Sequence, residues 1–290
     1  MDYQEFTYST LQGLPLMATF YPATQHSKDS QTILYIHGGG LVWGSRKDLP
    51  ADYIDLFHKA GYNFLTFDYP LAPETTLPEI VASIKQGIQW FHKVAASELK
   101  LSFSDFHLFG RSAGAYLAFL VCKDQTLPQP KTLISFYGYE SINASFYSKP
   151  SPYYLHFPTV SVELKNAIIG NKPLAFGAIE ERYGIYMYAR QSGRWLDMVL
   201  PAILQAKNYS LTDTDLLSLP PTFLAQSTTD EDVPYEIGES LAKKIPINQF
   251  VSVENEPHDF DKNPKNSKAL AVYHQLIQWL TSHEIKKDSN

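Results

Sequence analysis

The sequence predicts an α/β protein with a mostly parallel central sheet that helices cover on both faces. Short apolar runs rich in β-branched and aromatic residues recur along the chain, and each ends at a turn or a small residue. Segments with helical spacing lie between these runs, and strands that alternate with helices indicate parallel pairing. The 290 residues suffice for one large α/β domain, so we expect a single domain over residues 1–290.

Six of the apolar runs are predicted to be buried strands because they are short and nearly continuous. They cover residues 32–36, 63–67, 106–109, 132–136, 222–227 and 250–253. Residues 4–9 and 14–21 look like an antiparallel hairpin at one edge of the sheet, with its turn at Gln12 and Gly13. The predicted helices cover residues 78–94, 113–123, 235–243 and 268–280, and the polar tail from Ser282 is expected to fray.

The segment from about residue 140 to residue 212 interrupts this alternation. It concentrates aromatic side chains and holds two amphipathic stretches with helical spacing, near residues 178–190 and 195–206. We expect it to be an insertion that packs over the sheet. Its aromatic residues include Tyr147, Tyr153, Tyr154, Phe157, Phe176, Tyr183, Tyr186, Tyr188 and Trp195.

Composition excludes several classes of protein. The net charge of -6 and the absence of a basic run argue against a nucleic-acid partner. The single cysteine, Cys122, allows no internal disulfide. The first residues lack the basic and apolar parts of a signal peptide, and no apolar run approaches 18 residues. We therefore expect a cytoplasmic protein without a membrane span; the oligomeric state stays open.

A nucleophile motif occupies residues 110–114, which read Gly110-Arg111-Ser112-Ala113-Gly114. This G-x-S-x-G pattern follows a predicted strand and opens a predicted helix, which is the context that a nucleophile elbow requires. The sharp turn needs small residues and lifts the Ser112 hydroxyl clear of the sheet. It also directs the N–H groups of the helix N-terminus toward developing negative charge. An incidental Gly-Ser turn is the alternative.

A glycine-rich loop, His37-Gly38-Gly39-Gly40, directly follows the first buried run. Attack by a serine on a carbonyl carbon creates an oxyanion, and glycine backbone can approach it closely with N–H donors. Ala113, the residue after the nucleophile, would supply another donor. A flexible glycine turn is the alternative, and His37 is expected to brace the loop.

An acid and a histidine follow the last two predicted strands. Asp230 and Asp232 both lie after residues 222–227, and we prefer Asp230 because it is closer to the strand end. His258 follows residues 250–253, so the chain order is Ser, Asp, His, as in α/β-hydrolases. An unperturbed histidine has a pKa of about 6.5, which suits a general base.

Three motifs in order give the chain a family resemblance. They are the His37–Gly40 loop, Asp68-Tyr69-Pro70-Leu71-Ala72-Pro73-Glu74 and Gly110–Gly114. The whole chain resembles the hormone-sensitive-lipase-like carboxylesterase branch of the α/β-hydrolases. The resemblance implies the α/β-hydrolase fold with residues 140–212 as a helical cap. Two residues depart from the family pattern: Arg111 stands where an acid is common, and Pro70 replaces a common arginine.

The resemblance also implies a function and a set of site residues. The nucleophile would be Ser112, the acid Asp230 and the base His258, and the oxyanion donors would be Gly39, Gly40 and Ala113. We expect a serine carboxylic-ester hydrolase that acts on small short-acyl esters without a cofactor or a metal. One alternative is a small peptidase or amidase of the same fold, since residues 230–234 resemble the acid loop of prolyl-oligopeptidase-like enzymes. The other is a non-catalytic ligand-binding protein on a hydrolase scaffold.

Overall fold

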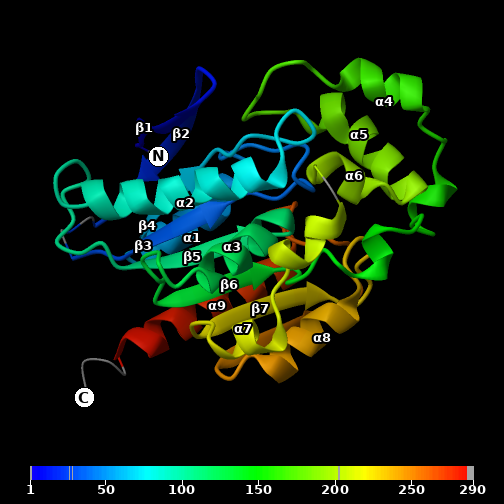
Figure 1. Ribbon diagram of the computed structural model, residues 1–290. Helices are drawn as coiled ribbons and strands as arrows, with labels where there is room; N and C mark the ends of the chain where they lie inside the picture. Colours follow the sequence, from blue (N-terminus) through cyan, green and yellow to red (C-terminus); the bar gives the residue numbers. More distant parts are fainter. Residues whose placement is uncertain (1, 26, 28, 202, 286–290) are drawn as a thin grey trace.

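The computed structural model describes residues 2–25, 27, 29–201 and 203–285, and within them a sheet of eight strands forms the centre (Figure 1). The strands run in the order β1-β2-β4-β3-β5-β6-β7-β8. Strands β3 to β8 pair in parallel, whereas β1 and β2 form an antiparallel edge. This confirms the predicted α/β fold with a mostly parallel sheet. The bounds are β1 (Gln4–Leu11), β2 (Leu14–Tyr21), β3 (Thr32–Ile36), β4 (Asn63–Phe67), β5 (Phe106–Arg111), β6 (Thr132–Phe136), β7 (Thr222–Ser227) and β8 (Asn248–Val253).

Helices cover both faces of the sheet. On one face lie α1 (Ala51–Lys59) and α9 (Ser267–Ile285), and on the other lie α2 (Leu77–Val94), α3 (Ala113–Lys123) and α8 (Tyr235–Lys244). Successive residues of β3 alternate between the two sides: Leu34 packs in the α2–α3 core and Tyr35 in the α1–α9 core. Because both faces are covered, every residue of β3 to β7 is buried. This explains why apolar residues occur on both faces of these strands.

Several boundaries differ from the sequence prediction. Strand β5 continues past residue 109 because Gly110 and Arg111 still pair with β6. The helix predicted near residues 195–206 is divided into α6 (Trp195–Val199) and the 3₁₀ segment η3 (Ile203–Tyr209), since Pro201 disfavours helical backbone at the residue before it. Helix α9 extends to Ile285, so the prediction of fraying from residue 282 is wrong up to that point. The remainder of that tail lies outside the described residues.

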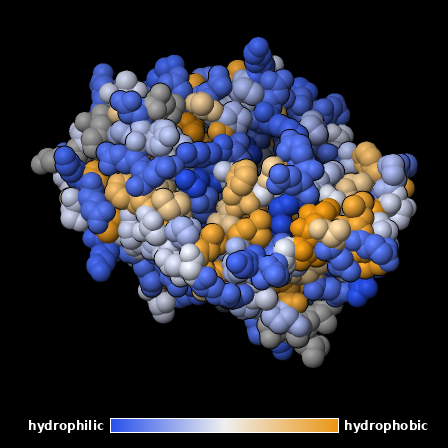
Figure 2. Space-filling model, turned by 90° about the horizontal axis from the view of Figure 1, so that it is seen from above, coloured by the Kyte–Doolittle hydropathy of each residue, from blue (hydrophilic) through white to orange (hydrophobic). Residues whose placement is uncertain are grey.

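Residues 140–212, which we call the cap segment, lie together beyond the carboxyl ends of the parallel strands (Figure 1). Exposed apolar side chains gather on this segment, and the view from above shows hydrophobic surface on that side of the molecule (Figure 2). The segment contains α6 and η3 together with η1 (Ser145–Tyr147), η2 (Tyr154–His156), α4 (Val162–Ile168) and α5 (Ile179–Ser192), and α7 (Asp213–Leu217) follows it.

A buried ion pair attaches the cap segment to the sheet domain. Arg182 of α5 contacts both carboxylate oxygens of Glu74, at 2.6 and 3.0 Å, and their side chains are only 5% and 1% exposed. The same guanidinium donates to the main-chain oxygens of Val42 and Ala72, at 2.5 and 2.9 Å. One arginine therefore connects α5 to the chain just after the glycine-rich loop and to the loop after β4.

We expect Glu74→Gln to lower the free energy of unfolding by about 3 kcal/mol, because it leaves the buried Arg182 charge without a carboxylate partner. The urea midpoint at an unchanged m-value measures this loss. Asp55→Asn, which removes the exposed ion pair with Lys59, is the matched control, and its effect should stay within about 0.5 kcal/mol. Equal midpoints for the two variants would contradict the role assigned to the buried pair.

Candidate active site

Ser112 lies at the sharp turn between β5 and α3. Its backbone is left-handed, with φ 52° and ψ -122°, and its N–H donates to the main-chain oxygen of Phe136 at 2.9 Å. A Cβ atom at Gly114 would come within 2.2 Å of the main-chain oxygen of Ile36, so only glycine fits at this position in the first turn of α3. These contacts hold the turn against the sheet and leave the Ser112 hydroxyl at the strand end.

The fold brings Ser112, His258 and Asp230 together from three different loops. Nε2 of His258 lies 2.9 Å from Oγ of Ser112, and Nδ1 lies 2.8 and 2.7 Å from the two carboxylate oxygens of Asp230. The Asp230 side chain is fully buried. It also accepts hydrogen bonds from the amide of Gln226 and from the N–H groups of Asp232 and Val233. These donors fix the carboxylate in front of the imidazole.

The electrostatic surroundings of His258 move its pKa above the ordinary value. Burial lowers the pKa, but the charge of Asp230 and its hydrogen bond to the imidazole outweigh this effect, and the pKa is raised to about 9. The value near 6.5 expected for an unperturbed histidine therefore does not describe this site. The imidazolium is the form that the neighbouring carboxylate stabilises.

Asp232, the other candidate acid, does not contact His258. Its Oδ1 instead accepts hydrogen bonds from the hydroxyls of Tyr154 and Tyr186, at 2.8 and 2.9 Å, and both tyrosines belong to the cap segment. Of the two acids considered from the sequence, only Asp230 is placed to orient the histidine.

The glycine-rich loop approaches Ser112 from β3. Gly39 has φ +92°, and a Cβ atom there would lie 2.1 Å from the main-chain oxygen of Trp43, so the loop requires glycine at this position. No described residue accepts a hydrogen bond from the N–H groups of Gly39, Gly40 or Ala113. These three N–H groups therefore have no acceptor within the described part of the chain.

Neighbouring side chains hold the glycine-rich loop from both sides. Below it, the ring of His37 stacks on Tyr69 at 4.0 Å, and the Tyr69 hydroxyl donates to the main-chain oxygens of His37 and Gly38, at 3.0 and 2.9 Å. Above it, Nε1 of Trp195 in the cap segment donates to the main-chain oxygen of Gly40 at 2.9 Å. The ring of Tyr186 is so close that a Cβ atom on Gly40 would lie 2.6 Å from it.

An ionic network that the sequence analysis missed joins the nucleophile turn to the histidine loop. Arg111, next to Ser112, lies 3.2 Å from Oδ2 of Asp261 and 3.3 Å from Oδ2 of Asp48. Asp261 is fully buried and also accepts hydrogen bonds from the hydroxyls of Tyr137 and Tyr273, at 2.6 and 2.7 Å. One sequence signal could have found it: an arginine replaces the common acid before the nucleophile, and an aspartate follows His258 by three residues.

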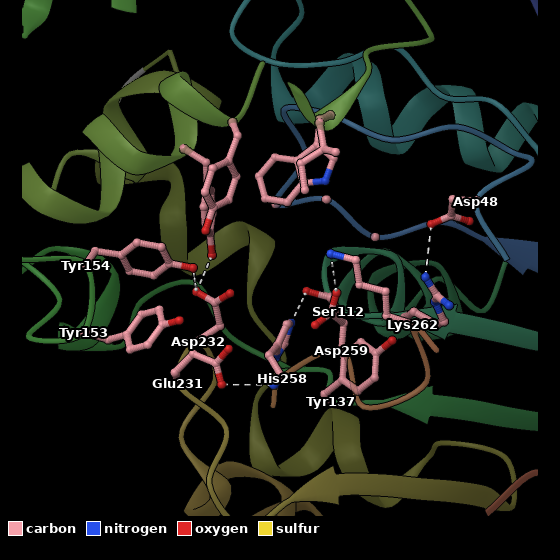
Figure 3. A pocket seen from close by; sticks show the side chains of 18 residues that line it. Asp48, Ser112, Tyr137, Tyr153, Tyr154, Glu231, Asp232, His258, Asp259 and Lys262 are labelled. Atoms are coloured by element: carbon pink, nitrogen blue, oxygen red, sulfur yellow. Dashed lines mark hydrogen bonds and ion pairs between the residues drawn. The ribbon is translucent and has the colours of Figure 1, made fainter. Parts of the chain in front are cut away.

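Ser112 and His258 line a cavity of about 380 Å³ between the strand ends and the cap segment (Figure 3). Among the described residues, no group of three or more His, Cys, Asp or Glu side chains is arranged to hold a metal ion. No helix within the described ranges is both long and apolar enough to cross a membrane. The side chains that line the cavity include Trp43, Asp48, Tyr153, Tyr154, Tyr183, Tyr186, Glu231, Asp232, Asp259 and Lys262.

Known proteins share both the sequence pattern and the fold. A family model described as alpha/beta hydrolase fold matches residues 33–261. A protein of unknown function from Staphylococcus aureus has a TM-score of 0.84 at 29% identity, covering 96% of this chain and 98% of that one. An alpha/beta hydrolase superfamily protein from Enterococcus faecalis has a TM-score of 0.82 at 30% identity, covering 97% and 98%. Several solved esterases align at 17–21% identity and TM-scores of 0.63–0.68, which shows the shared fold alone.

A curated relative is far longer than this chain. A non-reducing polyketide synthase from Emericella nidulans is 30% identical over 141 residues, which are 45% of this chain. The match spans only 6% of that relative's length. The similarity therefore concerns a small part of the synthase.

Proposed function

Because the chain belongs to the α/β-hydrolase superfamily, in its hormone-sensitive-lipase-like branch, we propose that it is a serine hydrolase of small carboxylic esters. We also propose that residues 1–290 form one hydrolase domain with residues 140–212 as its cap. The observation that carries the activity is the Ser112 hydroxyl, 2.9 Å from Nε2 of His258 at the wall of a cavity.

The proposed reaction proceeds in two halves. Oγ of Ser112 attacks the ester carbon while Nε2 of His258 takes the hydroxyl proton, and Asp230 stabilises the imidazolium that forms. The N–H groups of Gly39, Gly40 and Ala113 donate to the oxyanion. His258 then gives the proton to the departing alcohol and leaves an acyl group on Ser112. A water molecule, activated by the same imidazole, releases the carboxylic acid.

A fluorophosphonate probe tests the proposal, because it labels serines that an adjacent base activates. We expect labelling at Ser112 and turnover of p-nitrophenyl esters. The absence of both would favour the alternative of a ligand-binding protein on a hydrolase scaffold. A matched panel of esters and amides separates the esterase from the peptidase or amidase reading of the same fold.

We expect kcat/KM to fall on the acid side through one ionisation well above pH 6.5. His258 accepts the serine proton only when neutral, and its pKa is raised to about 9, so activity should rise with pH across the neutral range. A pH series of kcat/KM measures this, and His258→Ala should abolish the activity. A profile that is flat down to pH ~5 would argue against a histidine base.

We expect a preference for short acyl groups, from acetyl to roughly hexanoyl, because the cavity of about 380 Å³ lies at the small end of ligand pockets. Each added methylene gains only about 0.8 kcal/mol on burial, whereas a clash with the cap segment costs more. Values of kcat/KM for p-nitrophenyl esters from acetyl to palmitoyl measure the preference. An optimum at the long end, or activation at an oil–water interface, would contradict it.

A further inference from the structure

One wall of the cavity presents a fixed carboxylate with a free oxygen. Oδ1 of Asp232 accepts both tyrosine hydrogen bonds, from Tyr154 and Tyr186, whereas no described residue donates to Oδ2. Asp232 lines the cavity and lies on the side away from Lys262 and Asp48 (Figure 3). A purely apolar substrate would remove Oδ2 from water without offering it a donor, which costs free energy.

Aromatic rings surround this carboxylate. Trp43 makes edge contacts with Tyr183 and Tyr186, at ring-centre distances of 5.5 and 4.8 Å, and Tyr154 meets Tyr186 at 5.6 Å. All four rings and Tyr153 line the same cavity. The faces of tryptophan and tyrosine attract cations, and this attraction is strongest where water is excluded.

The charges that line the cavity leave an excess of negative charge next to these rings. Asp48 pairs with Arg111, and Asp259 lies 3.8 Å from Lys262. Glu231 and Asp232 are the exceptions, since neither carboxylate has an ion-pair partner among the described residues. The Glu231 carboxylate accepts hydrogen bonds from main-chain N–H groups, among them that of His258 at 3.0 Å.

Arg190 is the cation behind this wall, and it attracts the Asp232 carboxylate without donating a hydrogen bond to it. Its guanidinium lies over the rings of Tyr154 and Tyr186, at 5.5 and 5.8 Å. It donates to the main-chain oxygen of Asp232 at 3.2 Å and not to the carboxylate. It is absent from the cavity lining, so it does not compete with a ligand for Oδ2.

We propose that Asp232 and the rings of Trp43, Tyr153, Tyr154, Tyr183 and Tyr186 form a subsite for a cationic group of the substrate. The preferred substrates are then esters that carry an ammonium group a few bonds from the ester carbonyl. The ammonium group pairs with Oδ2 of Asp232 and lies against the aromatic rings. This inference rests on the proposed ester hydrolysis at Ser112 and names the substrate class of that site.

The test compares two esters that differ only in charge. The 2-(trimethylammonio)ethyl and 3,3-dimethylbutyl esters of butyric acid have nearly the same shape, with a quaternary nitrogen in the first and a quaternary carbon in the second. We expect kcat/KM to be at least about tenfold higher for the charged ester, because an ion pair and a cation–π contact both favour its binding. The ratio is taken on one preparation, so it does not depend on the fraction of folded enzyme.

Two variants assign the effect to the carboxylate. Asp232→Asn keeps an oxygen for the two tyrosine hydroxyls but removes the charge, so the ratio should fall by about threefold or more, and the part that the aromatic rings provide should remain. Asp55→Asn removes a carboxylate on α1 whose one ion-pair partner in the described part of the chain is Lys59, and its ratio should match that of the unmodified protein. This control carries the same change of net charge at a distant place in the fold.

The possible results separate the two proposals. A ratio of one or less in the unmodified protein, with Ser112 still labelled by the fluorophosphonate, overturns the cationic subsite and leaves ester hydrolysis standing. A ratio that Asp232→Asn leaves unchanged also overturns the subsite. No labelling and no turnover of either ester would overturn the proposed function, and the subsite with it.

Discussion

Ser112→Ala is expected to lower kcat for ester hydrolysis by about 10³-fold or more, as in other serine triads. The substitution removes only the hydroxyl that faces His258, and the Cβ atom at the nucleophile turn stays. The fold should therefore be retained, with an unchanged urea midpoint. The measurement is kcat for a p-nitrophenyl ester at saturating substrate, together with fluorophosphonate labelling.

Ser135→Ala is the matched control for this loss. Ser135 is a buried serine on β6, and its hydroxyl makes no hydrogen bond to any described residue. Removing that hydroxyl should leave kcat within about a factor of two, because a small change at a buried site without partners costs little. If Ser112→Ala turned over esters as fast as Ser135→Ala, the nucleophile would have to be a different residue.

Asp230→Asn is expected to lower kcat by up to about 10⁴-fold, far more than Asp232→Asn. The amide that replaces the Asp230 carboxylate can donate to Nδ1 of His258 and favours the wrong tautomer. Asp232 contacts two tyrosine hydroxyls and not the imidazole, so its substitution should alter the choice of substrate more than the chemical step. Steady-state kinetics with a neutral ester ranks the two variants.

The pH dependence of kcat/KM for the Asp230→Asn variant provides a second test of the acid role. The charge of Asp230 raises the pKa of His258 against the opposing effect of burial. Without that charge the pKa falls, so the acid limb of the residual activity should move to lower pH. An unmoved limb, or a larger loss of activity in Asp232→Asn, would assign the acid role to Asp232.

The sequence predicted the centre of the fold because burial on both faces leaves a simple signal. Strands β3, β4, β6 and β7 have the predicted bounds, since a strand covered by helices on both sides carries apolar residues on both of its faces. Helix α1 was not predicted. Its segment is short, so periodicity over nine residues gives little evidence.

Site residues could be predicted from the sequence where they belong to a local motif. The turn at Ser112 needs its glycines, and the loop at Gly39 needs its left-handed backbone, so both patterns are visible in the sequence. The contact of Asp232 with Tyr186 joins residues 46 positions apart, and that of Arg182 with Glu74 joins residues 108 positions apart. No local rule links such pairs, because the packing of the cap segment on the sheet decides them.

Helix α6 contacts the glycine-rich loop and α5 contacts the chain just after it, and these contacts couple the cap segment to the proposed oxyanion hole. Arg182 donates to the main-chain oxygen of Val42, and Trp195 donates to that of Gly40. A hinged opening of these helices would remove the donors that shape the loop. Because such linkage is reciprocal, a ligand at the loop stabilises the closed position of the cap segment. The closed cap segment strengthens binding of that ligand by the same free energy. Under the proposed function, we therefore expect substrate selection by the cap segment and stabilisation of the oxyanion to be coupled, so that a change in either alters both.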